Sequence, residues 1–309
     1  MRFATVETGG RQVVVLWTER GLIDLQAAAA SQAAVDGPKI EATGARWSMI
    51  DLIAAGEPSM LFAREVLAHP ERFESARLDR DAVQLLAPIP KTPHNVYCLG
   101  RNYAEHIQED NASRDKQTAL PEHPQFFTKP STAIIGDGGN IRYDERVTRR
   151  LDYEVELAVV IGRGGRDIRA ADAMDHVFGY TIVNDITARD LQRRHDQWFK
   201  GKALDTSCPM GPFIVTADEI SDPHALRIAL EVNGEPRQDA STGDMIFRIP
   251  ETIESLSAGL TLEPGDVIAT GTPSGVGYAM NPRRWLAGGD VIKCSIELIG
   301  TLTNSVVAV

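Results

Sequence analysis

The sequence has few of the features that mark exported or disulfide-bonded proteins. Its 309 residues include only three cysteines, at positions 98, 208 and 294, and no C-x-x-C motif. Three widely separated cysteines cannot close a disulfide framework in pairs. The N-terminal segment has one basic residue and reaches Glu7 and then Gly9 before an apolar signal core can form. We therefore expect reduced, buried thiols in a cytoplasmic protein.

The chain also lacks a long apolar run and an excess of positive charge. No apolar run reaches the roughly 18 residues that a membrane-spanning helix needs. The sequence contains 32 Lys and Arg against 43 Asp and Glu, a net charge of −11, which argues against nucleic acid or an anionic membrane surface as the main partner. An anionic substrate would accordingly need a locally positive pocket.

Two glycine-rich runs lack the residues that bind nucleotides. The run 271–277 has no G-K-[ST] ending and no following helix start, and the run 162–165 does not match the dinucleotide fingerprint. The second run is typical of a turn after a strand. Neither run predicts a nucleotide site.

The first third of the chain has the pattern of a small α+β domain. Residues 2–7 and 12–17 predict a β-hairpin around a glycine turn, and residues 47–55 and 60–68 have apolar residues at helical spacing, with a break at 56–58. A proline-rich passage at 86–93 cannot sustain a helix and suits an extended connector. We predict an N-terminal domain over 1–86, a linker over 87–94 and a catalytic domain over 95–309.

The predicted catalytic domain consists of short apolar runs separated by glycine and proline. This pattern indicates an α+β, mainly β fold, a sandwich or barrel with flanking helices. The polar, charged stretch 110–124 predicts a mobile loop that acts as a lid. The apolar runs lie at 96–99, 125–128, 154–161, 179–183, 213–216, 227–232, 267–270 and 291–298.

Two glutamates alternate along one of these apolar runs. At a period of two residues, Asp152, Glu154 and Glu156 share one face of the strand, and neighbouring carboxylates lie roughly 6.6 Å apart. Asp185 ends a second buried run, 177–184, where a side chain can project into a pocket. Acids gathered beside core strands suit a hard divalent cation. The alternative is an amphipathic strand whose acidic face is solvated.

Six motifs follow one another in the second part of the chain, and together they resemble the fumarylacetoacetate hydrolase family, in particular its acylpyruvase and diketo-acid hydrolase-like members. The resemblance extends from residue 95 to the C-terminus. It implies a Mg²⁺ or Mn²⁺ site on Glu154, Glu156 and Asp185, a catalytic domain built as a mixed β-roll after a small variable domain, and a homodimer. The motifs are Gly100-Arg101-Asn102-Tyr103-Ala104-Glu105-His106, Phe127-Thr128-Lys129-Pro130-Ser131, residues 152–162, residues 184–192, Lys202 followed by Cys208-Pro209, and residues 271–277.

The catalytic candidates are a histidine, a glutamate and a lysine. His106 and Glu109 stand one helical turn apart, so the carboxylate can orient the imidazole and raise its basicity. An H-x-x-E pair on a solvated helix surface is the alternative, and the resemblance favours a base that activates water. Either Lys200 or Lys202 can point inward by sequence alone, and the resemblance selects Lys202 as the cation that stabilises an enolate.

The remaining candidates are assigned to substrate binding. The resemblance implies that Gln192 holds a substrate oxygen and that Thr272 donates a hydrogen bond to the substrate carboxylate, and Arg101 is assigned with them. Lys129 is placed in the same group, although a charge beside the metal or a structural salt bridge accounts for it, and for Arg189, equally well.

The predicted reaction produces an enolate of the pyruvate type. We rank first a metal-dependent hydrolase that cleaves a carbon–carbon bond in an acylpyruvate or related 2,4-diketo acid. Decarboxylation of oxaloacetate-like acids is second, and hydration or isomerisation of unsaturated 2-keto acids is third. A non-enzymatic keto-acid-binding protein is the alternative of another class. It predicts the loss of a carboxylate, His106 or Lys202, and all of these residues are present.

Overall fold

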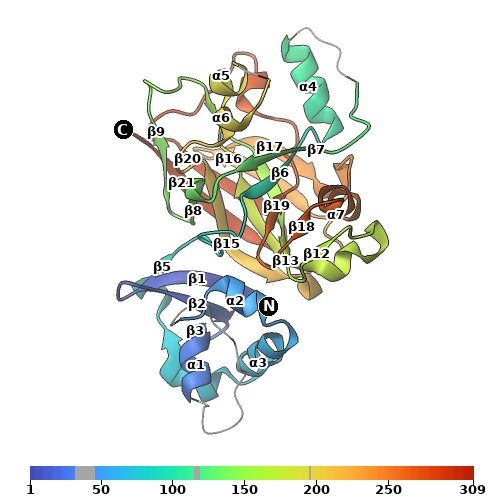
Figure 1. Cartoon of the computed structure of the whole chain (residues 1–309). Coiled ribbons are helices and arrows are strands. Elements are labelled where there is room, and N and C mark those ends of the chain that lie inside the picture. The colour runs from blue at the N-terminus through green and yellow to red at the C-terminus, as the bar shows by residue number, and fades with distance from the viewer. Residues whose placement is uncertain (32–45, 115–118, 195) are drawn as a thin grey trace.

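The computed structural model describes residues 1–31, 46–114, 119–194 and 196–309. The N-terminal elements form a smaller lobe beside a larger, mainly β lobe, and a twisted sheet runs from one into the other (Figure 1). Within the described residues, no helix is long and apolar enough to cross a membrane.

The N-terminal lobe contains the predicted hairpin and helices. Strands β1 (Arg2–Thr8) and β2 (Arg11–Thr18) turn at Gly9 and Gly10, whose φ angles of 55° and 70° suit a two-residue hairpin turn. Ser48 caps helix α2 (Met49–Ala54), and α3 (Glu57–Ala68) starts three residues before the predicted bound because a proline fits the first helical turn. The lobe also contains β3 (Gly21–Asp24), α1 (Leu25–Ser31), the 3₁₀ helices Pro70–Ala76 and Arg80–Ala82, β4 (Arg77–Leu78) and β5 (Gln84–Leu85).

The sheet of this lobe continues into the second part of the chain. Strand β1 pairs antiparallel with β15 (Cys208–Thr216), so that Phe3 lies opposite Ile214. Residues 87–94 form neither helix nor strand, as expected of a connector, and Ala87 and Ile89 within them are buried. The division of the chain at this connector stays a prediction.

The large lobe consists of two sheets packed face to face. The first continues from β15 through β13 (Val177–Asn184), β11 (Val155–Ile161), β19 (Val267–Ala269) and β6 (Val96–Gly100) to β7 (Gln125–Lys129). The second has the order β17 (Glu235–Ser241), β16 (Arg227–Val232), β20 (Val291–Ile296), β21 (Gly300–Ala308) and β9 (Asn140–Tyr143). Parallel and antiparallel pairs occur together, and helix α7 (Ile249–Ser257) lies beside the sheets. The predicted α+β, mainly β fold is confirmed.

Strand β11 is buried on both faces, and this decides where its acidic side chains lie. Val155, Leu157 and Val159 belong to the core between the two sheets. Ala158 and Val160, on the opposite face, belong to a second core that includes apolar residues of the N-terminal lobe. Period-two alternation therefore separates two packed faces, and the solvated-face alternative for the acidic residues is wrong.

The prediction of a loop from residue 110 is also wrong at its start. Helix α4 (Ala104–Arg114) continues through residues 110–114. The next segment, 115–118, forms the centre of the predicted lid and lies outside the described residues. Three acidic side chains of α4 accept hydrogen bonds from the segment 274–278. These long-range contacts hold the helix against the body of the protein although its sequence is polar.

Two short helices complete the scaffold of the site. Helix α5 (Arg189–Gln192) packs on α6 (Phe199–Lys202), and Gly201 is the residue at the contact. A Cβ atom at Gly201 would lie 2.6 Å from Cα of Gln192, closer than packed atoms approach. The glycine therefore allows Gln192 and Lys202 to reach the same region.

We predict that Gly201→Ala lowers the free energy of unfolding by about 1–3 kcal/mol, because the added methyl group forces α5 and α6 apart. Denaturant unfolding followed by circular dichroism measures the change. The exposed neighbour gives a matched control, and Lys200→Ala should stay within about 0.5 kcal/mol of the wild type. Equal stability of the two variants would contradict the packing described here.

Candidate active site

Three carboxylates meet where strand β11 begins and strand β13 ends. Glu156 lies in β11, Glu154 directly precedes it, and Asp185 directly follows β13. Each contributes an oxygen to a group whose members all lie within 4.8 Å of one another, and all three side chains are buried. The Asp185 N–H donates to the Glu154 carbonyl at 2.8 Å, which holds the two segments together. The predicted convergence of the three acids is confirmed.

Two lysines neutralise part of this charge. The Lys202 ammonium donates to Glu154 Oε2 at 2.6 Å and to Asp185 Oδ2 at 2.5 Å, so it bridges two carboxylates. Lys129 Nζ donates to Asp185 Oδ1 at 2.7 Å and to the Lys202 carbonyl at 2.5 Å. Lys202 is the inward-pointing lysine of its segment, while Lys200 is exposed.

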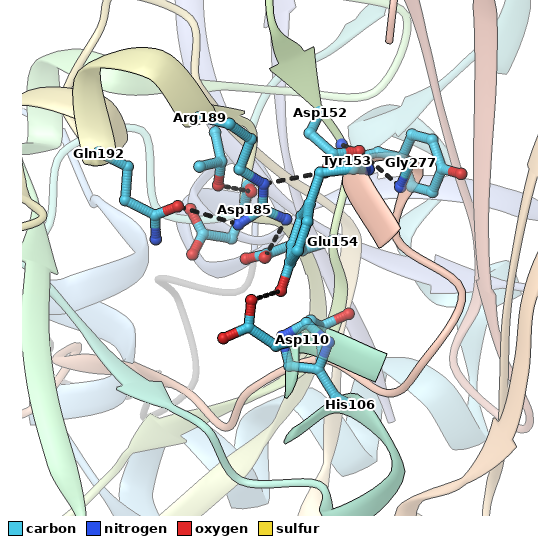
Figure 2. A network of polar contacts seen from close by, with 12 residues as sticks. His106, Asp110, Asp152, Tyr153, Glu154, Asp185, Arg189, Gln192 and Gly277 are labelled. Atoms are coloured by element: carbon cyan, nitrogen blue, oxygen red, sulfur yellow. Dashed lines mark hydrogen bonds and ion pairs between the residues drawn. The ribbon is translucent and has the colours of Figure 1, made fainter. Parts of the chain in front are cut away.

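Arg189 supplies a third cation. Its Nη2 donates to Glu154 Oε1 at 2.5 Å and its Nε to Asp152 Oδ2 at 2.8 Å, while Nη1 donates to Gln192 Oε1 at 3.2 Å (Figure 2). Asp152 also accepts from the Gly277 N–H at 2.8 Å. Asp152 lies on the same strand face as Glu154, as the alternation predicts, but its carboxylate binds the Arg189 guanidinium and the Gly277 N–H.

Glu156 is the one of four neighbouring carboxylates that has no ion pair among the described residues; it accepts a hydrogen bond from the Gly271 N–H at 2.8 Å. Four buried carboxylates, those of Asp152, Glu154, Glu156 and Asp185, face three cations, those of Lys129, Lys202 and Arg189.

The shifts in pKa follow this balance. Burial raises the pKa of Glu156 well above its usual range, and the charges of Asp185 and Glu154 raise it further. Burial also opposes ionisation of Glu154, but Arg189 and Lys202 outweigh it and lower that pKa. Oxygen donors with one uncompensated negative charge fit a hard divalent cation. Glu154, Glu156 and Asp185 are the residues that would hold it.

The His106 and Glu109 pair forms as its spacing predicts. His106 Nδ1 lies 2.8 Å from Glu109 Oε1, and Glu109 Oε2 accepts from the Gly275 N–H at 2.9 Å. The carboxylate is thus fixed from both sides, and it holds the imidazole with Nδ1 directed at Glu109. Nε2 is then the nitrogen that His106 can present to a ligand.

Sequence reasoning did not identify Tyr278 and Asp110, which complete the wall around His106. The Tyr278 hydroxyl donates to Asp110 Oδ1 at 2.7 Å, and its ring centroid lies 6.4 Å from that of His106. The Arg189 guanidinium lies 4.4 Å from the centre of the same ring. No local pattern predicts this contact, because Asp110 falls in the segment predicted to be a loop and Tyr278 lies 168 residues away.

These residues surround one cavity of about 590 Å³. Seven of the ten predicted site residues line it, namely Arg101, His106, Glu154, Glu156, Gln192, Lys202 and Thr272. Glu109 and Asp185 lie behind them and contact the lining residues. Lys129 also lies behind the wall, fully buried, where it neutralises Asp185 and does not reach a substrate. This position favours the salt-bridge interpretation of Lys129 over direct substrate binding.

The outer wall of the cavity is aromatic and positively charged. Trp198 packs edge-on against Phe127 with ring centroids 5.6 Å apart. The Arg101 guanidinium lies 5.8 Å from the centre of the Trp198 ring, and Arg101 adopts a φ of 56°, an uncommon value for a residue other than glycine. Arg193 and Arg283 also line the cavity. Its five basic side chains, with Arg189 and Lys202, face four lining carboxylates, those of Asp110, Glu154, Glu156 and Asp196, so the local balance is positive by one charge.

Comparison with known proteins gives the family. A model described as fumarylacetoacetate (FAA) hydrolase C-terminal matches residues 95–307. Oxaloacetate tautomerase YisK of Bacillus subtilis (strain 168) is 46% identical over 311 residues, which cover 99% of this chain and 100% of that protein.

Solved structures agree with this assignment. A fumarylacetoacetate hydrolase (EaFAH) from Exiguobacterium antarcticum has a TM-score of 0.77 and 38% identity over the full length of both chains. Maleylpyruvate hydrolase from Sphingobium sp. SYK-6, in complex with manganese(II) ion and pyruvate, has a TM-score of 0.76 and 30% identity and covers 100% of this chain and 99% of its own. As its six motifs predicted, the chain belongs to the fumarylacetoacetate hydrolase family of enzymes.

Proposed function

We propose that this protein is a divalent-metal-dependent enzyme that interconverts the keto and enol forms of oxaloacetate or a similar dicarboxylic 2-keto acid. The observation that carries the proposal is the meeting, in one cavity, of an oriented histidine, three buried carboxylates and the Lys202 ammonium. The name of the 46% identical relative, an oxaloacetate tautomerase, supports the substrate class. For this reason we rank enolisation without carbon–carbon cleavage above the hydrolysis that the sequence alone ranks first.

A proton transfer at carbon 3 of the substrate gives the His106–Glu109 pair a role in the reaction. Nε2 of His106 takes a C3 proton, the C–H electron pair forms the C2–C3 double bond, and the C2 carbonyl pair moves onto its oxygen. Glu109 stabilises the imidazolium, and the Lys202 ammonium offsets the charge that develops on oxygen. Return of the proton to that oxygen gives the enol. Glu154, Glu156 and Asp185 would hold a Mg²⁺ or Mn²⁺ ion, which would supply Lewis-acid polarisation of the carbonyl.

The remaining cavity residues suit a substrate with two carboxylates. Because the Arg189 guanidinium only donates, the Gln192 amide oxygen faces it and the amide nitrogen is the group offered to a ligand. We assign Gln192 and Thr272 to the keto-acid end. Arg101, which lines the same cavity next to Trp198, would bind a second carboxylate.

Hydrolysis of an acylpyruvate is the second candidate. The same histidine can take a proton from water, after which hydroxide attacks the distal carbonyl and the carbon–carbon bond breaks. The similarity to a maleylpyruvate hydrolase favours this reaction. The two activities differ in their products, because tautomerisation releases no fragment.

A first prediction concerns metal binding. Mn²⁺ added to chelated protein at about 100 times its Kd should stabilise the fold by about 2.7 kcal/mol, and Glu156→Gln should abolish this gain. His106→Asn, which leaves the three carboxylates intact, should retain it. Thermal unfolding with and without EDTA measures the effect. Equal stabilisation of Glu156→Gln and wild type would refute the metal assignment.

A second prediction follows from the pKa of Glu156. Because the folded protein raises this pKa, the side chain's contribution to stability is present at low pH and lost as the pH rises through the raised value. Without metal, Glu156→Gln should therefore be more stable than the wild type at pH 8 and equally stable near pH 4, close to the ordinary pKa of about 4.3. Urea unfolding in EDTA at the two pH values tests this. A variant that is less stable at pH 8 would show that the ionised carboxylate is favoured.

A third prediction tests the base. His106→Asn should lower kcat for oxaloacetate tautomerisation by about 10²–10⁴-fold, since it removes the proton acceptor. The decay of enol absorbance in the presence of Mn²⁺ measures it. Glu105→Gln is the matched control, because Glu105 lies on the same helix and its carboxylate accepts a hydrogen bond from Ser274 Oγ at 3.1 Å, outside the His106–Glu109 pair. Pyruvate release from acetylpyruvate, with no effect on the enol, would favour hydrolysis.

A fourth prediction tests the substrate class. Arg101→Gln should raise KM for oxaloacetate about tenfold, the loss expected for one charge-assisted hydrogen bond of about 1.5 kcal/mol. Acetylpyruvate ends in a methyl group, and its binding should change less. Arg284→Gln, at an exposed arginine that pairs with Glu235, is the control. An equal change for both substrates would place Arg101 away from the second carboxylate.

A further inference from the structure

A buried glutamine links the second sheet to the cavity wall. Gln238 lies in β17, its side chain is 2% exposed, and its amide reaches the start of β11 and the turn that contains Thr272. Its Oε1 accepts from the Val155 N–H at 3.0 Å. Its Nε2 donates to Thr272 Oγ1 and to the Pro273 carbonyl, both at 2.8 Å.

Two of these partners fix the orientation of the amide. The Val155 N–H can only donate, so the amide oxygen must face it, and the Pro273 carbonyl can only accept, so the amide nitrogen must face it. A flipped amide would lose both hydrogen bonds and place like groups against each other. The hydrogen bond to Thr272 must therefore run from Gln238 to the hydroxyl oxygen.

This direction determines what the Thr272 hydroxyl can do. A hydroxyl carries one proton and two lone pairs, and here one lone pair is taken by Gln238. Thr272 lines the cavity and is 4% exposed. In the part of the chain that the structure describes, no protein acceptor for its proton is recorded. The proton is thus left for a group in the cavity, and a carboxylate, which only accepts, is the complementary ligand.

We propose that Gln238 is a positioning residue that makes Thr272 a dedicated hydrogen-bond donor to the carboxylate at the keto-acid end of the substrate. The inference deepens the proposed function and rests on it for the identity of the ligand. Gln238 does not line the cavity, and Thr272 is the contact through which we infer that it acts on the ligand.

Reversal of the amide's polarity gives the sharpest test. In Gln238→Glu the carboxylate accepts the Thr272 proton and turns it away from the cavity. Calorimetric titration of pyruvate into the Mn²⁺-loaded protein should then show a Kd about tenfold higher or more, whereas the Kd of Mn²⁺ should stay within about twofold. Thr272→Val should raise the pyruvate Kd by a similar factor, and Thr272→Ser should restore it. Asp239→Asn, on the exposed face of the same strand, is the control.

The double variant distinguishes positioning from a structural role. If Gln238 acts through Thr272, Gln238→Glu in the Thr272→Val background should leave the pyruvate Kd unchanged from Thr272→Val alone. Three results would overturn the inference: a double variant whose pyruvate Kd rises by the product of the two single effects, an unchanged pyruvate Kd in Gln238→Glu, or no pyruvate binding by the Mn²⁺-loaded wild type. Should Gln238→Glu not fold, the apolar isostere Gln238→Met is tested by the same cycle, with a rise of about threefold that vanishes in the Thr272→Val background.

The binding measurement is independent of turnover. Pyruvate is a ligand and not a substrate in this experiment, so the cycle yields its result even where oxaloacetate is not tautomerised. Failure of tautomerisation with an intact cycle would refute the proposed reaction and leave the role of Gln238 in place. Failure of the cycle with normal tautomerisation would refute the role of Gln238 alone.

Discussion

The site depends on the buried contact of the Lys202 ammonium with Glu154 and Asp185. Isolated charges at these positions would be strongly unfavourable, and removal of one partner of such a pair commonly costs about 3–5 kcal/mol. The contact joins the beginning of one core strand, the end of its neighbour and a four-residue helix that follows Trp198. None of these segments could relax independently without leaving a charge without its counter-ion. Their relative positions are therefore set by electrostatics as much as by packing.

The same principle accounts for the charge of the cavity in an acidic protein. The net charge of −11 describes the whole chain. The cavity wall differs, because its five basic side chains, Arg101, Arg189, Arg193, Lys202 and Arg283, outnumber its four carboxylates, Asp110, Glu154, Glu156 and Asp196. Inside a poorly hydrated cavity, near charges dominate the field over distant ones. The buried carboxylates of Asp152, Glu154 and Asp185 hold two of these cations, Arg189 and Lys202, in place.

Residues paired by local spacing were predictable from pattern, and distant residues such as Asp185, Lys202 and Thr272 were predicted with the help of the family resemblance. Contacts that neither pattern nor motif marks were not predictable. Alternation along one strand identified Glu154 and Glu156, and helical spacing identified His106 with Glu109, because both patterns depend on local geometry. The contact of Asp110 with Tyr278 and that of Gln238 with Val155 join residues 168 and 83 positions apart. Such pairs depend on the packing of one sheet on another. The position of Lys129 behind the wall depends on the end of β7, the last strand of its sheet, meeting Asp185 after β13, which composition does not encode.

The pairing of β1 with β15 extends this dependence to the N-terminal lobe. Strand β15 is buried along its whole length and lies between β1 and β13, two strands away from the glutamates of β11. A fragment that began at residue 95 would lack β1, so the edge of β15 that pairs with Phe3 would be exposed. Exposed apolar strand edges of this kind pair with other chains. The connector at 87–94 thus separates segments that differ in sequence pattern but share one sheet, and a shortened protein cut there should aggregate before its chemistry could be measured.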